Sequence, residues 1–259
     1  MLKKRLIPTL LLRNNRMVKG VEFDNYQDTG DPVFASKVYN SQYVDELVFI
    51  DIDATNESRS TNKEIIKSVS KECFMPLTIG GGVKSIEGIR DLLLVGADKV
   101  MINSAAYNDE NLIKKSSEIF GAQCIVIGID VRFENNEYVL YKNSGKIKLK
   151  TKLIDHLKRM EELGAGEFFI NNITNDGVMK GYDLNLINIV TSNTNIPVIA
   201  SGGAGNFKHL VDAYKSTSVS GLAMASIFHF GDNNPIRARF HLKNNKVNIK
   251  EVKNINLIK

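Results

Sequence analysis

The sequence predicts an α/β protein whose residues 1–242 form a single-domain (β/α)8 barrel, the TIM barrel, and whose residues 243–259 form a basic C-terminal tail. Three observations predict this fold. Eight short apolar segments alternate with segments of helical spacing. The chain of 259 residues has about the length that eight such units need, and its two halves resemble one another.

The eight apolar segments are expected to form parallel strands. Most of them are nearly continuous apolar runs, as in strands buried on both faces. They are residues 6–11, 47–51, 77–80, 100–103, 125–130, 168–171, 198–201 and 222–225. Between them apolar residues recur at helical spacing, for example in residues 86–93 before Gly96 and 153–163 before Gly164. Glycine directly after such a pattern is a typical helix end.

An internal repeat favours a closed barrel over a doubly wound open sheet. Residues 76–82 (PLTIGGG) align with 197–203 (PVIASGG) at an offset of 121 residues, and residues 49–52 fall near 170–173 at the same offset. Each half then holds four βα units, so we expect a half-barrel internal repeat. Chance alignment of glycine-rich turns is the alternative.

Glycine-rich turns follow two of the expected strands, at 80–82 and 201–203, and each is followed one strand later by a second turn, at 103–104 and 225–226. Glycine lets backbone N–H groups approach an anion closely, and a helix N-terminus adds positive potential. Because such barrels place chemistry at the carboxyl ends of their strands, we predict two phosphate sites facing each other across the mouth. The alternative is that these glycines only make tight turns.

Charged side chains at the same ends are candidates for catalysis or substrate contact. Asp130 ends an otherwise apolar strand and is a candidate general acid or base with a raised pKa. Asp51 ends the second strand, and Asp176 lies in an Asn-Asp-Gly turn, where turn chemistry is an equal explanation. Lys19, expected in the first βα loop, faces either a phosphate or solvent.

Four charged residues stand directly before apolar runs, at the opposite ends of the strands: Arg5, Glu46, Lys99 and Glu167. Two cations and two anions placed in this way are expected to ring the bottom of the barrel. Either they form a salt-bridge layer, which often adds little net stability, or they form a gate over a passage along the barrel axis. The sequence leaves both interpretations open.

Composition excludes several other classes of protein. The net charge of +5 is spread along the chain, so we expect anionic small molecules rather than nucleic acid as ligands. Leu6 to Leu12, the longest apolar run, is too short to span a membrane and contains Pro8, and the N-terminus lacks a secretory signal pattern. With two cysteines and no metal-ligand spacing among four histidines, we expect a reduced cytoplasmic protein with neither metal nor organic cofactor.

Ten segments resemble the HisF family, the cyclase subunit of imidazole glycerol phosphate synthase, from about Leu2 to about Gly231. They are residues 18–20, 30–32, 45–49, 80–82, 96–100, 102–106, 163–167, 181–183, 199–205 and 226–230. The resemblance implies a TIM barrel that binds a HisH-like glutaminase on its bottom face, with Asp98 in contact with that partner. Ammonia would then pass the four charged residues, all of which match the family, and travel up the barrel.

The resemblance also implies a substrate, the bis-phosphorylated ribonucleotide PRFAR, which the family converts with ammonia to imidazole glycerol phosphate and an aminoimidazole carboxamide ribotide. The site residues that it implies, together with those already named, are Lys19, Asp51, Gly81, Gly82, Asn103, Ser104, Asp130, Asp176, Gly177, Ser201, Gly202, Gly203, Ala225 and Ser226. No cofactor is implied.

The first strand departs from the family pattern Ile-Pro-Cys-Leu-Asp-Val. This chain reads Ile-Pro-Thr-Leu-Leu-Leu, so that Leu11 replaces one of two catalytic carboxylates, the partner of Asp130. Asn171 stands where the family has Thr, and Val178 and the pair Lys150-Thr151 also differ. A leucine cannot carry a proton, and loss of half of an acid–base pair costs orders of magnitude in rate.

Two functions follow from this pattern, beside a third possibility, a catalytically silent protein that binds a phosphorylated ligand. The one we favour is a diverged paralogue that still receives ammonia from a glutaminase and serves the amidation of a sugar for surface polysaccharide, together with a third, amidotransferase protein. The alternative is a genuine cyclase that acts on PRFAR in histidine biosynthesis with Asp130 alone. Both functions use the same predicted site residues. They differ in the molecule that accepts the ammonia.

Overall fold

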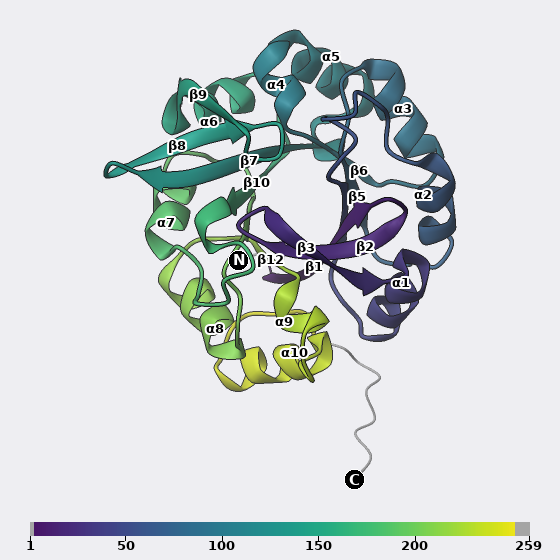
Figure 1. Ribbon diagram of the computed structural model, residues 1–259. Coiled ribbons are helices and arrows are strands. Elements are labelled where there is room, and N and C mark those ends of the chain that lie inside the picture. The colour runs from purple at the N-terminus through teal and green to yellow at the C-terminus, as the bar shows by residue number, and fades with distance from the viewer. Residues whose placement is uncertain (1–2, 252–259) are drawn as a thin grey trace.

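The computed structural model describes residues 3–251 and confirms the predicted barrel (Figure 1). Eight strands pair in parallel, and the last pairs with the first, so the sheet closes. Around the barrel they are β1 (Arg5–Arg13), β4 (Leu47–Asp51), β5 (Leu77–Gly80), β6 (Lys99–Ile102), β7 (Ile125–Glu134), β10 (Glu167–Asn172), β11 (Val198–Ser201) and β12 (Gly221–Met224).

Helices surround the barrel (Figure 1). They are α1 (Pro32–Ser41), α2 (Lys63–Ser70), α3 (Ile86–Leu94), α4 (Ser104–Asn108), α5 (Glu110–Phe120), α6 (Leu153–Glu162), α7 (Leu184–Ser192), α8 (Phe207–Ser216), α9 (Ser226–His229) and α10 (Pro235–Asn244), with 3-10 turns at Ala122–Cys124 and Ile173–Asn175. An Asp, Asn or Ser side chain caps the N-terminus of most of the longer helices. The helices predicted at 86–93 and 153–163 are α3 and α6.

Successive side chains along each strand point alternately outward and inward, which produces two apolar layers. On β1, Leu6 and Leu10 face outward and are buried against the helices, whereas Ile7 faces inward. The inner apolar layer consists of Ile7, Val48, Met101, Val126, Phe169, Ile199 and Ala223. Side chains therefore fill the middle of the barrel, as is usual for this fold.

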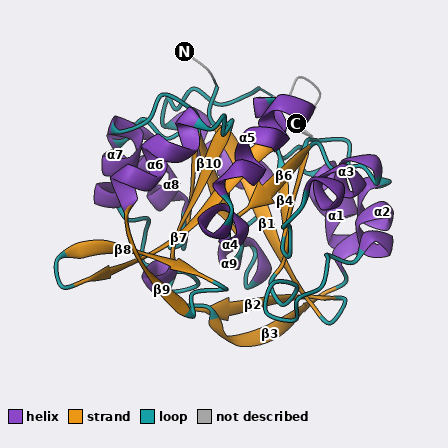
Figure 2. Ribbon diagram, turned by 90° about the horizontal axis from the view of Figure 1, so that it is seen from above, coloured by secondary structure: helices purple, strands orange, loops and turns teal. Residues whose placement is uncertain are grey.

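Two antiparallel hairpins, which the sequence analysis did not predict, extend the barrel at one end (Figure 2). The first consists of β2 (Arg16–Val21) and β3 (Asp24–Gly30), and the second of β8 (Glu137–Lys142) and β9 (Ile147–Lys152). Lys19, expected in a loop, lies on β2. A signal was present in the turns that lead into the hairpins. Asn14-Asn15 joins β1 to β2 and Asn135-Asn136 joins β7 to β8, and both pairs take the two positive φ angles of a tight turn between antiparallel strands.

The strand boundaries differ slightly from those predicted. Arg5, Lys99 and Glu167 are the first residues of their strands rather than the residues before them. At the C-terminus, the boundary expected after residue 242 falls inside α10. Ile249 is buried and pairs with Lys4 beside β1, so part of the expected tail packs on the barrel. Residues 252–259 lie outside the described residues.

Candidate functional site

A cavity of about 310 Å³ opens at the carboxyl ends of the barrel strands. The predicted site residues all line it, although the sequence spreads them from position 11 to position 226. They are Leu11, Lys19, Asp51, Gly81, Gly82, Asn103, Ser104, Asp130, Asp176, Gly177, Ser201, Gly202, Gly203, Ala225 and Ser226. The fold thus brings together one pocket from eight strands and the loops that follow them.

Asp130 and Leu11 stand on opposite walls of this pocket. Their strands, β7 and β1, are separated by three strands on either side of the closed barrel. Asp130 is buried, and its carboxylate accepts a hydrogen bond of 2.9 Å from Asn103 Nδ2. Burial raises the pKa of Asp130 to about 7, although the hydrogen bond opposes this rise. A carboxyl group with such a pKa exchanges its proton readily near neutral pH.

Lys19 and Asp176 form a buried ion pair with an Nζ–Oδ2 distance of 2.7 Å. Lys19 Nζ also donates to the carbonyl of Gly20, and the carbonyl of Asp176 accepts from the backbone N–H of Glu22. Burial raises the pKa of Asp176, while the Lys19 ammonium opposes this rise. These contacts hold the β2–β3 hairpin against the loop after β10, so both residues help to shape the pocket.

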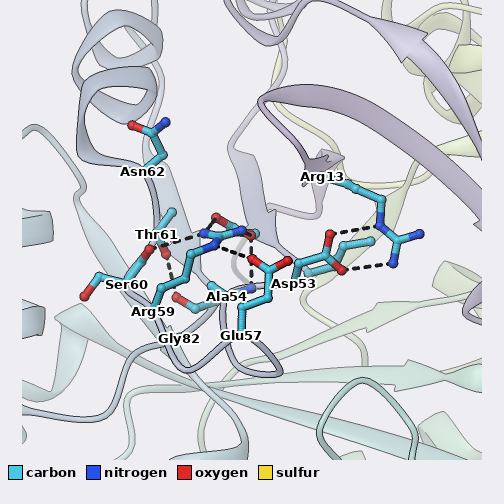
Figure 3. Close-up of polar contacts among 12 residues, drawn as sticks. Arg13, Asp53, Ala54, Glu57, Arg59, Ser60, Thr61, Asn62 and Gly82 are labelled. Carbon is cyan, nitrogen blue, oxygen red and sulfur yellow. Dashed lines mark hydrogen bonds and ion pairs between the residues drawn. The ribbon is translucent and has the colours of Figure 1, made fainter.

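Arg59, which the sequence analysis missed, lines the pocket and binds the predicted site residue Asp51. Its guanidinium makes two hydrogen bonds to the Asp51 carboxylate, of 2.5 and 3.0 Å, and a third of 2.6 Å to Glu57 (Figure 3). The Asp51 side chain is 1% exposed. Because Arg59 lies in a loop without periodic pattern, only the folded chain reveals this pairing.

Arg59→Ala is expected to lower the free energy of unfolding by about 1–2 kcal/mol, because it leaves the buried Asp51 carboxylate without its charged donor. The value is reduced for the 38% exposure of the Arg59 side chain. Urea denaturation would measure it. Arg16→Ala is the matched control, since the Arg16–Asp28 pair is half exposed on both sides and should contribute little to stability. Equal losses in the two variants would contradict the expectation.

A second ionic contact holds the β2–β3 hairpin from the other side. Arg13, at the end of β1, makes two hydrogen bonds of 2.9 Å to Asp53 (Figure 3). Its guanidinium lies 4.3 Å from the ring centroid of Tyr26. Tyr26 and Phe23 line the pocket. Burial raises the pKa of Tyr26 to about 12, so its phenol stays protonated. The sequence analysis named none of these four residues.

The glycine-rich turns pass close to neighbouring backbone. Gly81 has a φ of 104°, and a Cβ at this position would lie 2.2 Å from the carbonyl oxygen of Asp51. Gly203 has a φ of 110°, and a Cβ there would lie 1.9 Å from the carbonyl oxygen of Gly181. Only glycine fits these turns. The tight-turn interpretation therefore holds at both positions, and the phosphate interpretation remains a prediction.

At the other end of the strands the four charged residues form a closed ring of ion pairs. Arg5 contacts Glu46 at 2.8 Å and also contacts Glu167, and Lys99 contacts Glu46 at 2.9 Å and Glu167 at 2.8 Å. Thr78, on the inner wall, donates a hydrogen bond of 2.7 Å to Glu46. Both glutamates are buried, and both cations are about one fifth exposed.

Asp98 directly precedes Lys99 of this ring and is exposed, although its carboxylate also accepts a hydrogen bond from the backbone N–H of Leu77.

Within residues 3–251 no group of three or more His, Cys, Asp or Glu side chains is placed to hold a metal ion. No helix in the same range combines the length and apolar character that crossing a bilayer requires.

Of the residues that depart from the family pattern, Asn171 lines the pocket, and its amide oxygen has no hydrogen-bond partner among the described residues. Lys150 and Thr151 lie on β9, in the second hairpin. Val178 follows Gly177 in the turn after β10. The changes therefore concern the mouth, while the ring at the bottom keeps all four charges.

Comparison with known proteins agrees with this geometry. A family model described as a histidine biosynthesis protein matches residues 5–234. The imidazole glycerol phosphate synthase subunit HisF of Hydrogenobaculum sp. (strain Y04AAS1) is 43% identical over 96% of this chain and 100% of its own length. The same subunit of Chlorobaculum parvum is 44% identical over 89% of this chain and 92% of its own, and that of Petrotoga mobilis 42% over 96% and 100%. The chain therefore belongs to the HisF family of histidine biosynthesis proteins.

Proposed function

We propose that this chain is the synthase subunit of a glutamine amidotransferase complex. It receives ammonia from a HisH-like glutaminase bound at the bottom of the barrel, and it delivers the ammonia to a phosphorylated acceptor in the pocket at the top. The observation that carries this proposal is the contrast between the two ends of one barrel. The ring of Arg5, Glu46, Lys99 and Glu167 is complete, whereas the uncharged side chain of Leu11 stands opposite the Asp130 carboxylate.

The ring supports the role of a gate. Its four charged side chains alternate in sign around the barrel axis. They lie below the inner apolar layer that a neutral ammonia molecule would cross. Opening it requires only that one cation leave two glutamates, and both cations are partly exposed. The relatives are named as subunits, which supports a partner for this chain too.

Leu11 supports an acceptor other than PRFAR. The family pairs a carboxylate at this position with the one at Asp130, and cyclisation of PRFAR needs both a proton donor and a proton acceptor. With Leu11 in the pocket, one of these is missing. We propose amidation of a sugar for surface polysaccharide, carried out together with a third, amidotransferase protein.

A second candidate is a working cyclase for PRFAR in histidine biosynthesis. The names of the relatives and the family description favour it. The pocket residues that would bind the two phosphates of PRFAR, among them Gly81, Gly82, Gly202 and Ser226, are retained. In that case Asp130 would act as the only carboxylate of the reaction.

The test has two arms. PRFAR and ammonium chloride at pH 8.5 are supplied to the purified chain, with the Petrotoga mobilis HisF subunit assayed alongside. A rate at least about a hundredfold below that of the relative is expected, from the missing proton carrier. A rate equal to that of the relative would rule out the first proposal and leave the second.

The other arm measures binding of a HisH-type glutaminase by isothermal titration calorimetry. We expect a stable complex, and we expect Asp98→Lys to weaken it at least about tenfold by placing like charge beside Lys99. Lys114→Glu, a charge reversal on the side of the barrel at α5, is the control and should bind as the wild type does. Absence of a complex would contradict the role as a synthase subunit.

A further inference from the structure

Three polar side chains from adjacent strands stand together on one wall of the pocket, and we call them the polar wall: Asn103, Asp130 and Asn171. Asp130 and Asn171 lie on β7 and β10, and Asn103 directly follows β6; these three strands are consecutive in the barrel. Asp130 and Asn171 are paired in register, and Asn103 donates to Asp130 at 2.9 Å. The polar wall is therefore one continuous surface rather than three separate contacts.

The polar wall and the strand facing it hold oxygens without partners. The amide oxygens of Asn103 and Asn171 are buried and accept no hydrogen bond from the described residues. On β1, the hydroxyl of Thr9, whose residue is 5% exposed, is likewise unpartnered. A buried polar atom without a partner has lost its hydration without gaining a hydrogen bond, which is unfavourable. A ligand that donates several hydrogen bonds would remove this cost.

The charge of the polar wall is also uncompensated. Three carboxylates line the pocket in the described part of the chain. Asp51 is paired with Arg59 and Asp176 with Lys19, but Asp130 has no cation beside it. A buried carboxylate without a counter-charge is unfavourable, and a small cation bound to it relieves the penalty.

The polar wall lies where the inner apolar layer ends. Two positions before Asn103 and Asn171 on their strands are Met101 and Phe169, which belong to that layer. Gly202, beside Asn171, leaves space at the amide, since a Cβ there would lie 3.2 Å from its oxygen. A small polar molecule that leaves the apolar layer would therefore meet the side chains of Asn103 and Asn171.

We propose that the polar wall, with Thr9 across the cavity, binds ammonia as the ammonium ion before it reaches the acceptor; this inference rests on the proposed function. Ammonium can donate four hydrogen bonds, and its positive charge would neutralise the carboxylate of Asp130. A neutral ammonia molecule takes the proton of the Asp130 carboxyl group, which leaves an ammonium–carboxylate pair. Return of that proton to Asp130 frees the nitrogen lone pair for attack on the acceptor.

The test measures the melting temperature of the full-length chain in ammonium chloride and in tetramethylammonium chloride at equal ionic strength. We expect stabilisation by ammonium only. Asn171→Leu should raise the half-saturating ammonium concentration at least about tenfold, the effect of one lost hydrogen bond to a charged group. Asn171→Asp should lower it. Asn188→Leu, the same change on the exposed face of α7, is the control.

A crystal soaked with thallium(I), a cation of similar size, gives a second readout that does not depend on folding of the variants. An anomalous peak beside Asp130 and Asn171 is expected. A peak only at Glu46 and Glu167, or equal stabilisation by both salts, would overturn the proposal. That result, with glutaminase binding intact, would leave the proposed function standing. Ammonium binding without any glutaminase complex would refute the proposed function alone.

Discussion

Leu11→Asp is expected to raise the rate of PRFAR conversion with ammonia at least about a hundredfold above the wild-type rate. A positioned proton carrier contributes about 10²- to 10⁴-fold, and position 11 faces Asp130 across a pocket whose other candidate residues are in place. The measurement is steady-state turnover of PRFAR at saturating ammonium chloride, without a glutaminase.

Leu11→Asn is the control for this prediction, because the amide has nearly the shape of the carboxylate but carries no titratable proton. It should stay near the wild-type rate. Two results would contradict the argument. One is a wild-type rate as high as that of Leu11→Asp, which would show that the pocket works with one carboxylate. The other is equal gains from Asp and Asn, which would point to polarity rather than proton transfer.

Asp130→Asn is expected to abolish amination of any acceptor while stabilising the fold at pH 8. Burial raises the pKa of Asp130 to about 7 from a usual 3.8. The folded state therefore holds this proton more tightly than the unfolded state does, and its contribution to stability is present below pH 4 and lost as the pH rises to 7. Over that range the loss reaches about 4 kcal/mol.

Urea denaturation at pH 4 and pH 8 would test this prediction. The asparagine amide does not ionise, so the variant does not lose stability as the pH rises. It should therefore be more stable than the wild type at pH 8 and should match it at pH 4. A retained rate of amination would contradict the catalytic role. A variant less stable than the wild type at pH 8 would contradict the unpaired state of the Asp130 carboxylate.

The strands of the barrel were predictable because each is buried on both faces, and continuous apolar runs such as residues 125–130 record that burial directly. The pocket was predictable for a related reason. In a parallel barrel every strand ends at the same mouth, so Asp51, Asp130 and the glycine turns had to meet once the strands were placed.

The hairpins were not predicted, because their strands are exposed and largely polar, as in Ile147–Lys152, and carry little hydrophobic period. Arg59 and Arg13 were missed for a similar reason. Each is one arginine among many along the sequence, and its partner, Asp51 or Asp53, is identified only by distance.

By itself the sequence determined the closed barrel, the place of the candidate site at its mouth, the four charges at the far end and the absence of a carboxylate at position 11. These depend on residue type and on strand order, and both can be read along the chain. Only the tertiary structure decided which charges neutralise one another. It pairs Lys19 with Asp176 and Arg59 with Asp51, and among residues 3–251 it places no cation in an ion pair with Asp130. Electrostatic pairing falls off over a few ångströms, and such distances exist only once the chain has folded.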